Sequence, residues 1–331
     1  MSSFDHYELP SDPDWEVPGE FNTHFNWEYQ NGRAGLMDLY RKGKQSQWDA
    51  ESRIDGSVDL DPDNPEQMPD ESIPIFSWAG FSKLTPSERA RVRRHFQAWQ
   101  ISQFLHGEQS ALICTARIVQ QVPSLDAKFY ASTQVIDEAR HVEAYSRLLN
   151  EKFELAYPIT LALKSLLDNI LQDSRWDMNY LGMQILMEGL ALAAFQLIRD
   201  GAKNPLAAAV NAYVMQDEAR HVAFGRMALQ DYYPELSDKQ RDEREEFVVE
   251  ACYLMRDRFL AKEVWERIGL PVAECEEHIR ESTMMAEFRS FLFSTHRAQR
   301  ETHRSLGAAD SARLRRHGDH EIFRSRCIRL A

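Results

Sequence analysis

Apolar residues recur every three or four positions through most of the chain between residues 85 and 268. This spacing places apolar side chains on one face of an α-helix, whereas the alternation at every second position that is typical of strands is nearly absent. The pattern therefore predicts an all-α protein. Its interruptions at proline and glycine divide the apolar run into separate helices.

Cap residues and breakers predict where the long helices begin and end. Thr85-Pro86-Ser87-Glu88 has the residues of a helix start with a capping box, and Pro123-Ser124 ends that helix and starts the next. Gly269 and Pro271 close the last long helix. We expect long helices over residues 86–122, 125–153, 174–200, 205–231 and 238–268, a partly helical connection over 159–171, and shorter helices over 272–281 and 284–293.

The two ends of the chain differ from this helical middle. Residues 1–80 are rich in acids and turn formers, with four prolines between Asp59 and Pro74, which predicts a loop-rich arm with one helix near residues 32–48. We therefore expect a loop-rich N-terminal arm over 1–80, a helical bundle over 81–270, and short helices with an Arg-rich tail over 271–331.

One six-residue segment occurs twice. Residues 137–142 and 217–222 both read Asp-Glu-Ala-Arg-His-Val, eighty positions apart. A further glutamate stands thirty residues before the glutamate of each copy. The midpoints of these two glutamate pairs are Pro123 and Lys203, which both fall in predicted turns. Residues equidistant from a hairpin turn lie at one height on facing helices, here about 22 Å from the turn at 1.5 Å per residue.

The repeated pattern has the composition of a two-metal site. Glutamate and histidine at positions i and i+3 share one helix face, and two such helices with one glutamate from each of two others form the inward ligand set of di-iron bundles. Four carboxylates among apolar residues are costly unless two divalent cations balance them. Oxygen and nitrogen ligands suit iron or manganese. The predicted ligands are Glu108, Glu138, His141, Glu188, Glu218 and His221. A single Glu-x-x-His is usually a surface pair, but two identical copies argue against coincidence.

Composition excludes several classes of function. The formal net charge of −13 argues against a nucleic-acid binder, which needs clustered Lys and Arg. Four scattered cysteines (Cys114, Cys252, Cys275 and Cys327) are typical of reduced thiols rather than of a disulfide framework. No signal peptide or bilayer-spanning run is visible, so we expect a cytoplasmic protein without a membrane partner.

At the repeated motif the sequence resembles the ferritin-like di-iron carboxylate superfamily. It looks most like the hydroxylase subunits of bacterial multicomponent monooxygenases, and it is also similar to the small subunit of class I ribonucleotide reductase and to di-iron arylamine N-oxygenases. The resemblance covers roughly residues 40–60 and 85–265. It implies a ferritin-like four-helix bundle with an internal two-fold repeat, extra helices and an N-terminal arm, and it implies two iron ions, replaceable by manganese, with dioxygen as co-substrate.

The resemblance also implies roles for residues around the metals. Asp137 and Asp217 would accept hydrogen bonds from the histidine rings and fix the tautomer that faces the metals. Arg140 and Arg220 would pair with these carboxylates, the alternative being that they are surface charges. Trp48 lies in a stretch that resembles the N-terminal arm of monooxygenase and reductase subunits, where a tryptophan approaches the same network.

Some positions depart from the relatives. Val214 stands where the known N-oxygenases have an extra histidine ligand, and Leu192 replaces a threonine of the monooxygenase hydroxylases. Ala111 and Met183 stand where ligand-binding oxidases have a cross-linked valine and tyrosine, which argues against that subgroup. Tyr145 stands where the reductase subunit has its radical tyrosine, although we favour a core tyrosine as its role.

These features predict a dioxygen-activating non-haem di-iron oxygenase that acts on a small organic substrate. We expect it to be a homodimer and to take electrons from a donor protein. The alternatives are a radical-generating subunit that uses Tyr145, and a ferritin-like iron storage or detoxification protein, although storage proteins of this fold are much shorter. The Arg-rich tail from Arg297 to Ala331 could dock an acidic electron-transfer partner, but a solvated end is the plainer interpretation.

Overall fold

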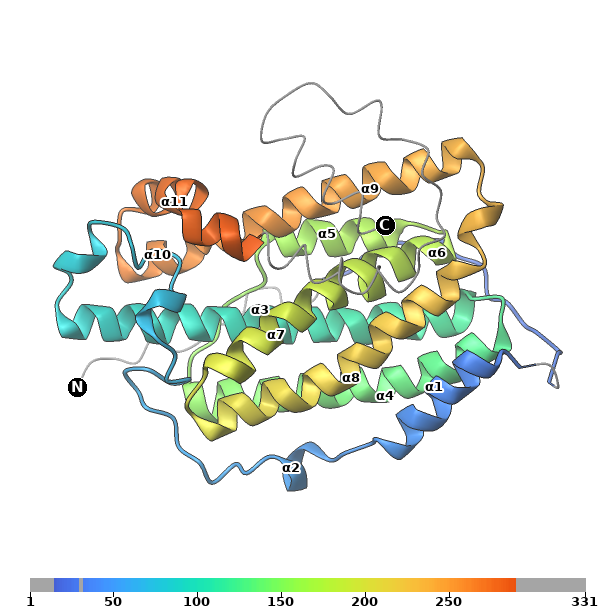
Figure 1. Ribbon diagram of the computed structural model, residues 1–331, viewed down its shortest axis with the longest axis horizontal. Coiled ribbons are helices and arrows are strands. Elements are labelled where there is room, and N and C mark those ends of the chain that lie inside the picture. The colour runs from blue at the N-terminus through green and yellow to red at the C-terminus, as the bar shows by residue number, and fades with distance from the viewer. Residues whose placement is uncertain (1–14, 30–31, 290–331) are drawn as a thin grey trace.

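The computed structural model describes residues 15–29 and 32–289 of the 331-residue chain. Within these ranges every regular element is helical and no strand occurs. The long helices lie side by side as a bundle, with shorter helices at one end (Figure 1). The all-α fold predicted from the apolar spacing is therefore confirmed.

Two antiparallel hairpins form the centre of the bundle. Helix α3 (Pro86–Gln121) pairs with α4 (Leu125–Arg147), and α7 (Glu188–Gly201) pairs with α8 (Pro205–Gln230) (Figure 1). The α3 helix starts with the predicted capping box, in which Thr85 accepts from the Glu88 backbone N–H and the Glu88 carboxylate accepts from the Thr85 N–H. Both predicted turns thus lie where the sequence midpoints placed them.

The run before α7 contains an irregular helix. The short α6 (Trp176–Tyr180) continues into a π-helical segment, Leu181–Met187, which ends directly at Glu188. Such wider turns occur frequently at functional sites. By length and composition, Trp176–Gly201 is apolar enough to cross a membrane, but 78% of its most apolar stretch is buried inside the protein. It is therefore placed like a core helix, and the cytoplasmic location stays a prediction.

The predicted helix over 238–268 is wrong as a single element. Helix α9 (Asp238–Asp257) passes into a 3-10 turn, Arg258–Leu260, and α10 (Lys262–Ile268) begins after it. Ala261 has a φ of 48° at this break, and the buried Trp265 indole N–H donates to the Leu260 carbonyl at 2.7 Å. The break redirects the chain so that α10 packs against α3, with α11 (Val272–Glu281) beside it (Figure 1).

The remaining elements cover the bundle. The N-terminal arm contains α1 (Ala34–Gln45), which packs on α4 and α8, and the short α2 (Ala50–Arg53). Helix α5 (Leu161–Gln172) packs against α9. Further single turns and helical residues are the π-helical Leu148–Phe153, the 3-10 turns Asp70–Ser72, Phe81–Lys83 and Tyr233–Glu235, and residues 283–289. The Arg-rich tail lies outside the described residues, and the division into three domains stays a prediction.

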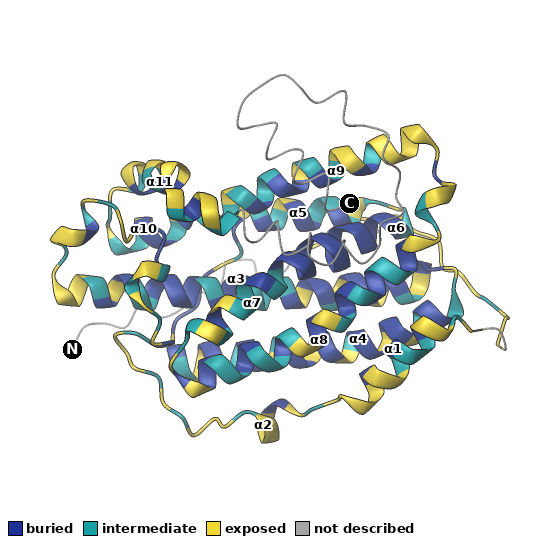
Figure 2. Ribbon diagram, in the orientation of Figure 1, coloured by how far each residue is buried: buried dark blue, intermediate teal, exposed yellow. Residues whose placement is uncertain are grey.

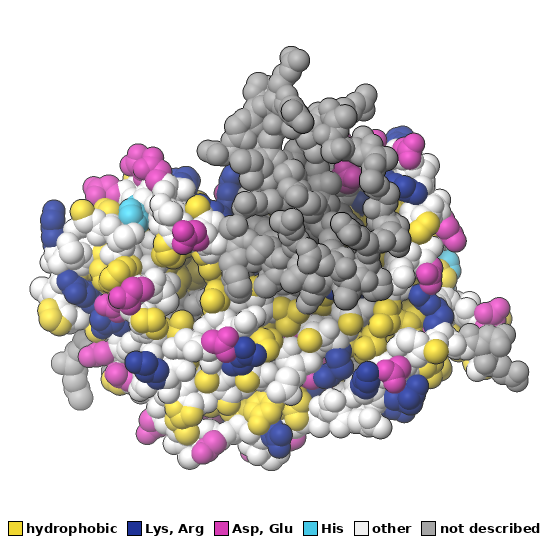
Figure 3. Space-filling model, viewed as in Figure 1, with side chains coloured by type: hydrophobic (Ala, Val, Ile, Leu, Met, Phe, Trp, Pro, Cys, Tyr) yellow, Lys and Arg dark blue, Asp and Glu magenta, His cyan; other side chains and the backbone are white. Residues whose placement is uncertain are grey.

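Burial follows the inner faces of the helices. Figure 2 shows buried residues concentrated on α3, α4, α7 and α8 where these helices face one another. On the face drawn in Figure 3, basic and acidic side chains are interspersed over the described parts instead of forming one basic patch. What is unusual about the interior is the number of ionisable groups that it contains.

Candidate metal centre

The structure brings all six predicted ligand residues into one buried cluster. They come from the middle of α3, α4 and α8 and from the first residue of α7, and none is more than 5% exposed. Two overlapping groups could each hold a metal ion, with ligand atoms within 4.8 Å of one another. The first group contains Glu108, Glu138, His141 and Glu218, and the second contains Glu138, Glu188 and His221.

Two of the glutamates lie between the two histidines. His141 Nδ1 is 3.4 Å from a Glu138 oxygen and 3.3 Å from a Glu218 oxygen, and it is 3.1 Å from Glu108. His221 Nδ1 is 3.1 Å from Glu138 and 3.2 Å from Glu218. Glu138 and Glu218 are therefore placed to bridge two cations.

The cluster has the free donor atoms that such cations need. Glu138 Oε2, Glu188 Oε2, both Glu218 oxygens and His221 Nδ1 are buried without a hydrogen-bond partner. Each unsatisfied buried polar group costs roughly 1–3 kcal/mol. Oxygen and nitrogen donors with four carboxylates match the charge and the ligand preference of two iron or manganese ions. The residues present thus fit a two-metal centre.

The titration of these groups reflects their burial. Burial, assisted by the charge of Glu218, raises the pKa of Glu108 to about 8, and burial raises the pKa of Glu188 well above its usual range. Burial alone would lower the pKa of His141, but its hydrogen bonds to Asp217 and to nearby glutamates raise that pKa well above 6.5. The interior thus disfavours the charged form of these glutamates. A divalent cation beside them would stabilise that form.

A polar network lies on the α4 and α8 side of the cluster. Each histidine turns its Nε2 toward the aspartate of the other repeat: His141 lies 3.1 Å from Asp217, and His221 lies 3.3 Å from Asp137. Arg140 donates to both aspartates, and Arg220 donates to Asp217. Both arginines are mostly buried, unlike the surface charges of the alternative interpretation.

The N-terminal arm closes this network from outside. Trp48 Nε1 donates to Asp217 Oδ2 at 2.8 Å, and its ring lies against the Arg140 guanidinium. The neighbouring Gln47 donates to Asp137 at 2.8 Å and accepts from Arg140 at 2.7 Å. Trp48 was predicted to approach this network, whereas no role was predicted for the adjacent Gln47 in the same stretch.

A second glutamine was also missed. Gln134 is fully buried on α4, and its Nε2 lies 2.9 Å from both a Glu138 oxygen and a Glu188 oxygen. It stands four residues before Glu138, as Val214 stands four before Glu218. A polar residue at this position of an otherwise buried helix face was the signal that could have found it.

Tyr145 lies near the cluster without a hydrogen bond to it. The Tyr145 hydroxyl donates to Asn211 Oδ1 at 3.1 Å, and its ring packs against Phe104 and Phe195. Burial raises its pKa well above 10. This environment resembles that of a core tyrosine, the role that we favoured from the sequence. Leu192 is half-buried, and Val214 is fully buried.

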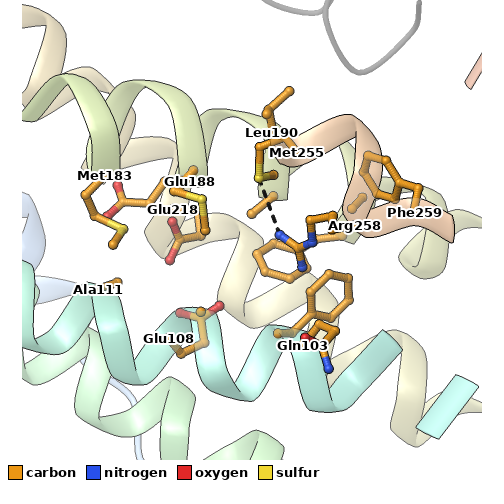
Figure 4. Close-up of a pocket in the computed structure, with 16 residues that line it drawn as sticks. Gln103, Glu108, Ala111, Met183, Glu188, Leu190, Glu218, Met255, Arg258 and Phe259 are labelled. Carbon is orange, nitrogen blue, oxygen red and sulfur yellow. Dashed lines mark hydrogen bonds between the residues drawn. The ribbon is translucent and has the colours of Figure 1, made fainter. Parts of the chain in front are cut away.

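A cavity opens on the other side of the cluster, between α3 and α7. Three of the glutamates (Glu108, Glu188 and Glu218) line it, together with mostly apolar side chains (Figure 4). Ala111 and Met183 are among these lining residues. The cavity thus reaches three of the candidate ligands next to α3 and α7, whereas the polar network lies along α4 and α8.

Comparisons with known proteins agree with this geometry. A family model described as P-aminobenzoate N-oxygenase AurF matches residues 30–307. A search of curated proteins found no match. Because the family match covers most of the chain, it favours an oxygenase over the radical-generating and iron-storage alternatives. It also points to N-oxygenases and not to the monooxygenase hydroxylases that the motif resembles most.

Solved structures with a similar fold include two structures of one mutant of R2-like ligand-binding oxidase. One has an anaerobically reconstituted Mn/Fe cofactor (17% identity, 80% of this chain and 94% of that chain, TM-score 0.52). The other has an aerobically reconstituted Mn/Fe cofactor (16% identity, 80% and 94%, TM-score 0.51). Another is Protein 19 with aldehyde deformylating oxidase activity from Synechococcus (19% identity, 62% and 92%, TM-score 0.45). The two oxidases show that the fold is ferritin-like. Through the family match, this chain belongs to the P-aminobenzoate N-oxygenase AurF family and is a di-iron oxygenase that acts on a small organic substrate.

Proposed function

We propose that this enzyme oxidises the nitrogen atom of a small aromatic amine, such as p-aminobenzoate. The observation that carries the proposal is the match to the AurF N-oxygenase family over residues 30–307. The cavity beside the candidate ligands supports it, because a small amine there would lie next to the metals. The oxygen atom inserted into the product would come from dioxygen.

In this proposal the six clustered side chains hold two irons. Glu108 and His141 would hold one iron and Glu188 and His221 the other, and Glu138 and Glu218, which lie close to both histidines, would supply oxygens to the pair. When bound and reduced, the two irons supply electrons for the activation of dioxygen. Val214 could not supply the additional imidazole that the known N-oxygenases have at this position, so the six clustered side chains alone would hold the irons.

The residues around the ligands have positioning roles in this proposal. Asp217 and Asp137 hold the Nε2–H tautomers of the histidines, so that both Nδ1 atoms face the metals. Arg140 balances the charge of the two aspartates from within hydrogen-bond distance. Gln134 fixes the orientation of two ligand carboxylates, because its amide donates to both. Apolar side chains around the cavity limit the access of water.

The proposal includes a protein electron donor and a homodimer. Repeated turnover needs an external source of electrons, because the oxygenation consumes those of the iron pair. For the dimer, the support is two exposed isoleucines on the α3–α4 hairpin. Ile113 is 51% and Ile136 is 56% exposed, and the two lie ten and thirteen residues from Pro123, at similar heights on adjacent helices.

The test combines metal analysis with product analysis. Anaerobic reconstitution with ferrous iron should give two irons per chain, and Glu138→Ala or Glu218→Ala should reduce this number. Reduced protein mixed with p-aminobenzoate and ¹⁸O₂ should give N-oxygenated product that carries ¹⁸O, detected by mass spectrometry. One iron or none would overturn the ligand assignment. Label on ring carbon, or no oxygenated product from any of a series of arylamines, would overturn N-oxygenation.

A further inference from the structure

The cavity beside the candidate metal centre contains an arginine, Arg258, that pairs with no carboxylate among residues 15–29 and 32–289. Arg258 belongs to the 3-10 turn that breaks the helical run after α9, and it lines the cavity with Met255 and Phe259 (Figure 4). Its Nε is buried without a hydrogen-bond partner. Its Nη1 lies 3.7 Å from the sulfur of Met255, which is only a weak acceptor.

Neighbouring arginines show how different this environment is. Arg256, two residues earlier, pairs with Asp257 at 2.7 Å, and the buried Arg244 pairs with Asp177 at 2.9 Å. Arg258 forms no ion pair with any Asp or Glu in the part of the chain that the structure describes. Burial lowers the pKa of Arg258 to about 10, and no nearby carboxylate opposes that change. The guanidinium is still charged at neutral pH.

The metal-ligand glutamates do not serve as the counter-ions of Arg258. Glu108, Glu188 and Glu218 line the same cavity, but their charges are balanced by the metals in the proposed site. Burial and the charges of Glu218 and Glu138 raise the pKa of Glu108, and His141 opposes that rise. The charge of Arg258 does act on His106 of α3. Burial and this positive charge both lower the pKa of His106. A buried charge that lacks a partner is destabilising, so its retention calls for another explanation.

The arrangement of residues around the cavity explains why a buried arginine lies there. In Figure 4 the glutamates lie toward one end and Arg258 with Phe259 toward the other, with apolar walls between them. Apolar walls suit the chemistry of an aromatic ring, and a guanidinium fork matches the two oxygens of a carboxylate. A substrate with an amine and a carboxylate at opposite ends of a ring would place its amine at the metals.

We propose that Arg258 is the specificity-determining residue that binds the carboxylate of the substrate. The enzyme then selects anionic aminoaryl acids over neutral arylamines. This inference rests on the proposed function in taking the cavity as the substrate site, but the anion-binding role of Arg258 can be measured without turnover. Arg258 shares the cavity-facing side of the chain with Met255 and Phe259, at helical spacing.

The cavity must enlarge to admit a ring. Its volume is about 60 Å³, whereas an engineered apolar cavity that binds benzene has roughly 150 Å³. Three methionines (Met183, Met187 and Met255) line it, and unbranched methionine side chains repack readily. Binding of the acid therefore displaces methionine side chains instead of the backbone of the bundle.

Binding by the iron-loaded, oxidised enzyme tests the inference. Isothermal titration with p-aminobenzoate and with its neutral amide should show the acid binding about 10- to 100-fold tighter, the range expected for a charge-assisted hydrogen-bonded pair. Arg258→Gln should remove this preference, and Arg258→Lys should retain part of it because it keeps the charge without the fork. Arg256→Gln is the matched control and should bind the acid as the unaltered enzyme does.

Thermal unfolding separates a binding role from a structural one. Without ligand, Arg258→Met should unfold at the same temperature as the unaltered enzyme or higher, because an unpaired buried cation is removed. It should also lose the rise in unfolding temperature that p-aminobenzoate gives. Equal binding of acid and amide by the unaltered enzyme, or an unchanged preference in Arg258→Gln, would overturn the inference. Arg258-dependent binding without N-oxygenated product would refute the proposed reaction and leave the role of Arg258 standing.

Discussion

Glu66 offers a quantitative test of how the arm is packed against the bundle. Its side chain is 1% exposed, and both carboxylate oxygens are without a hydrogen-bond partner. Its backbone N–H donates to Gln97 on α3, and its carbonyl accepts from Asn204, the N-cap residue of α8. Burial raises the pKa of this carboxyl from 4.5 to about 8. The substitution Glu66→Gln removes the titration and keeps the shape of the side chain.

The sign and size of the effect follow from proton linkage. Between pH 4.5 and 8 the folded protein keeps a proton on Glu66 that the unfolded chain has lost, so stability falls as pH rises. Each pH unit in this window lowers the free energy of unfolding by about 1.4 kcal/mol. From pH 5.5 to pH 7.5, the unaltered protein should therefore lose about 2.5 kcal/mol relative to Glu66→Gln.

Urea unfolding followed by far-ultraviolet circular dichroism measures this difference. Glu66→Gln also buries an unpaired amide, so the test is the change in the difference with pH and not its value at one pH. Glu66→Met should show the same dependence on pH, whereas Glu71→Gln at an exposed position of the same arm should show none. A difference that stays constant within about 0.5 kcal/mol from pH 5.5 to 7.5 would refute the buried, protonated state of Glu66.

Three further predictions concern the network, the core and the surface. Asp217→Asn should weaken ferrous iron binding or lower activity about 10- to 100-fold with unchanged helical content, measured by anaerobic iron titration and turnover. Arg244→Met should lower the free energy of unfolding by about 3–5 kcal/mol because it leaves Asp177 buried and unpaired, and adding Asp177→Leu should restore much of the loss in urea unfolding. Ile113→Glu combined with Ile136→Glu should convert a dimer into monomers in light scattering after size-exclusion chromatography, whereas an unchanged mass would place the dimer interface elsewhere.

Local sequence signals were sufficient for the helices of the bundle. The capping box at Thr85, the cap at Ser124 and the turn before Pro205 set boundaries that the structure reproduces. The break at Ala261 could not be predicted, because alanine is a strong helix former and no glycine or proline marks the position. A side-chain contact accompanies the break instead. The Trp265 indole N–H donates to the Leu260 carbonyl, which a continuous helix would pair with a backbone N–H.

The candidate ligands were predictable from the repeat and the two turns. The turns determine how far along the bundle each ligand lies, and the spacing within the repeat determines the helix face that carries it. Their outer partners were only partly predictable. Asp137 and Asp217 belong to the repeated motif, so resemblance suggested them, whereas Gln47 comes from an irregular arm whose path no periodicity describes. Arg258 was missed because the sequence did not show which face of the helix over residues 238–268 lies toward the cavity, although Met255, Arg258 and Phe259 share one face at helical spacing.

The internal repeat explains why the two sides of the metal cluster differ. The cavity lies between α3 and α7, the helices that carry the single glutamates, and its lining residues 103–111 and 183–191 correspond at the eighty-residue offset. The polar network lies between α4 and α8, which carry the two copies of the motif. The repeat thus provides a symmetric ligand set with one apolar side and one charged side. Segments outside the repeat then complete each side, the arm with Trp48 on the charged side and the turn with Arg258 on the apolar side. Substrate selectivity can therefore change through that turn without any change in the residues proposed to hold the metals.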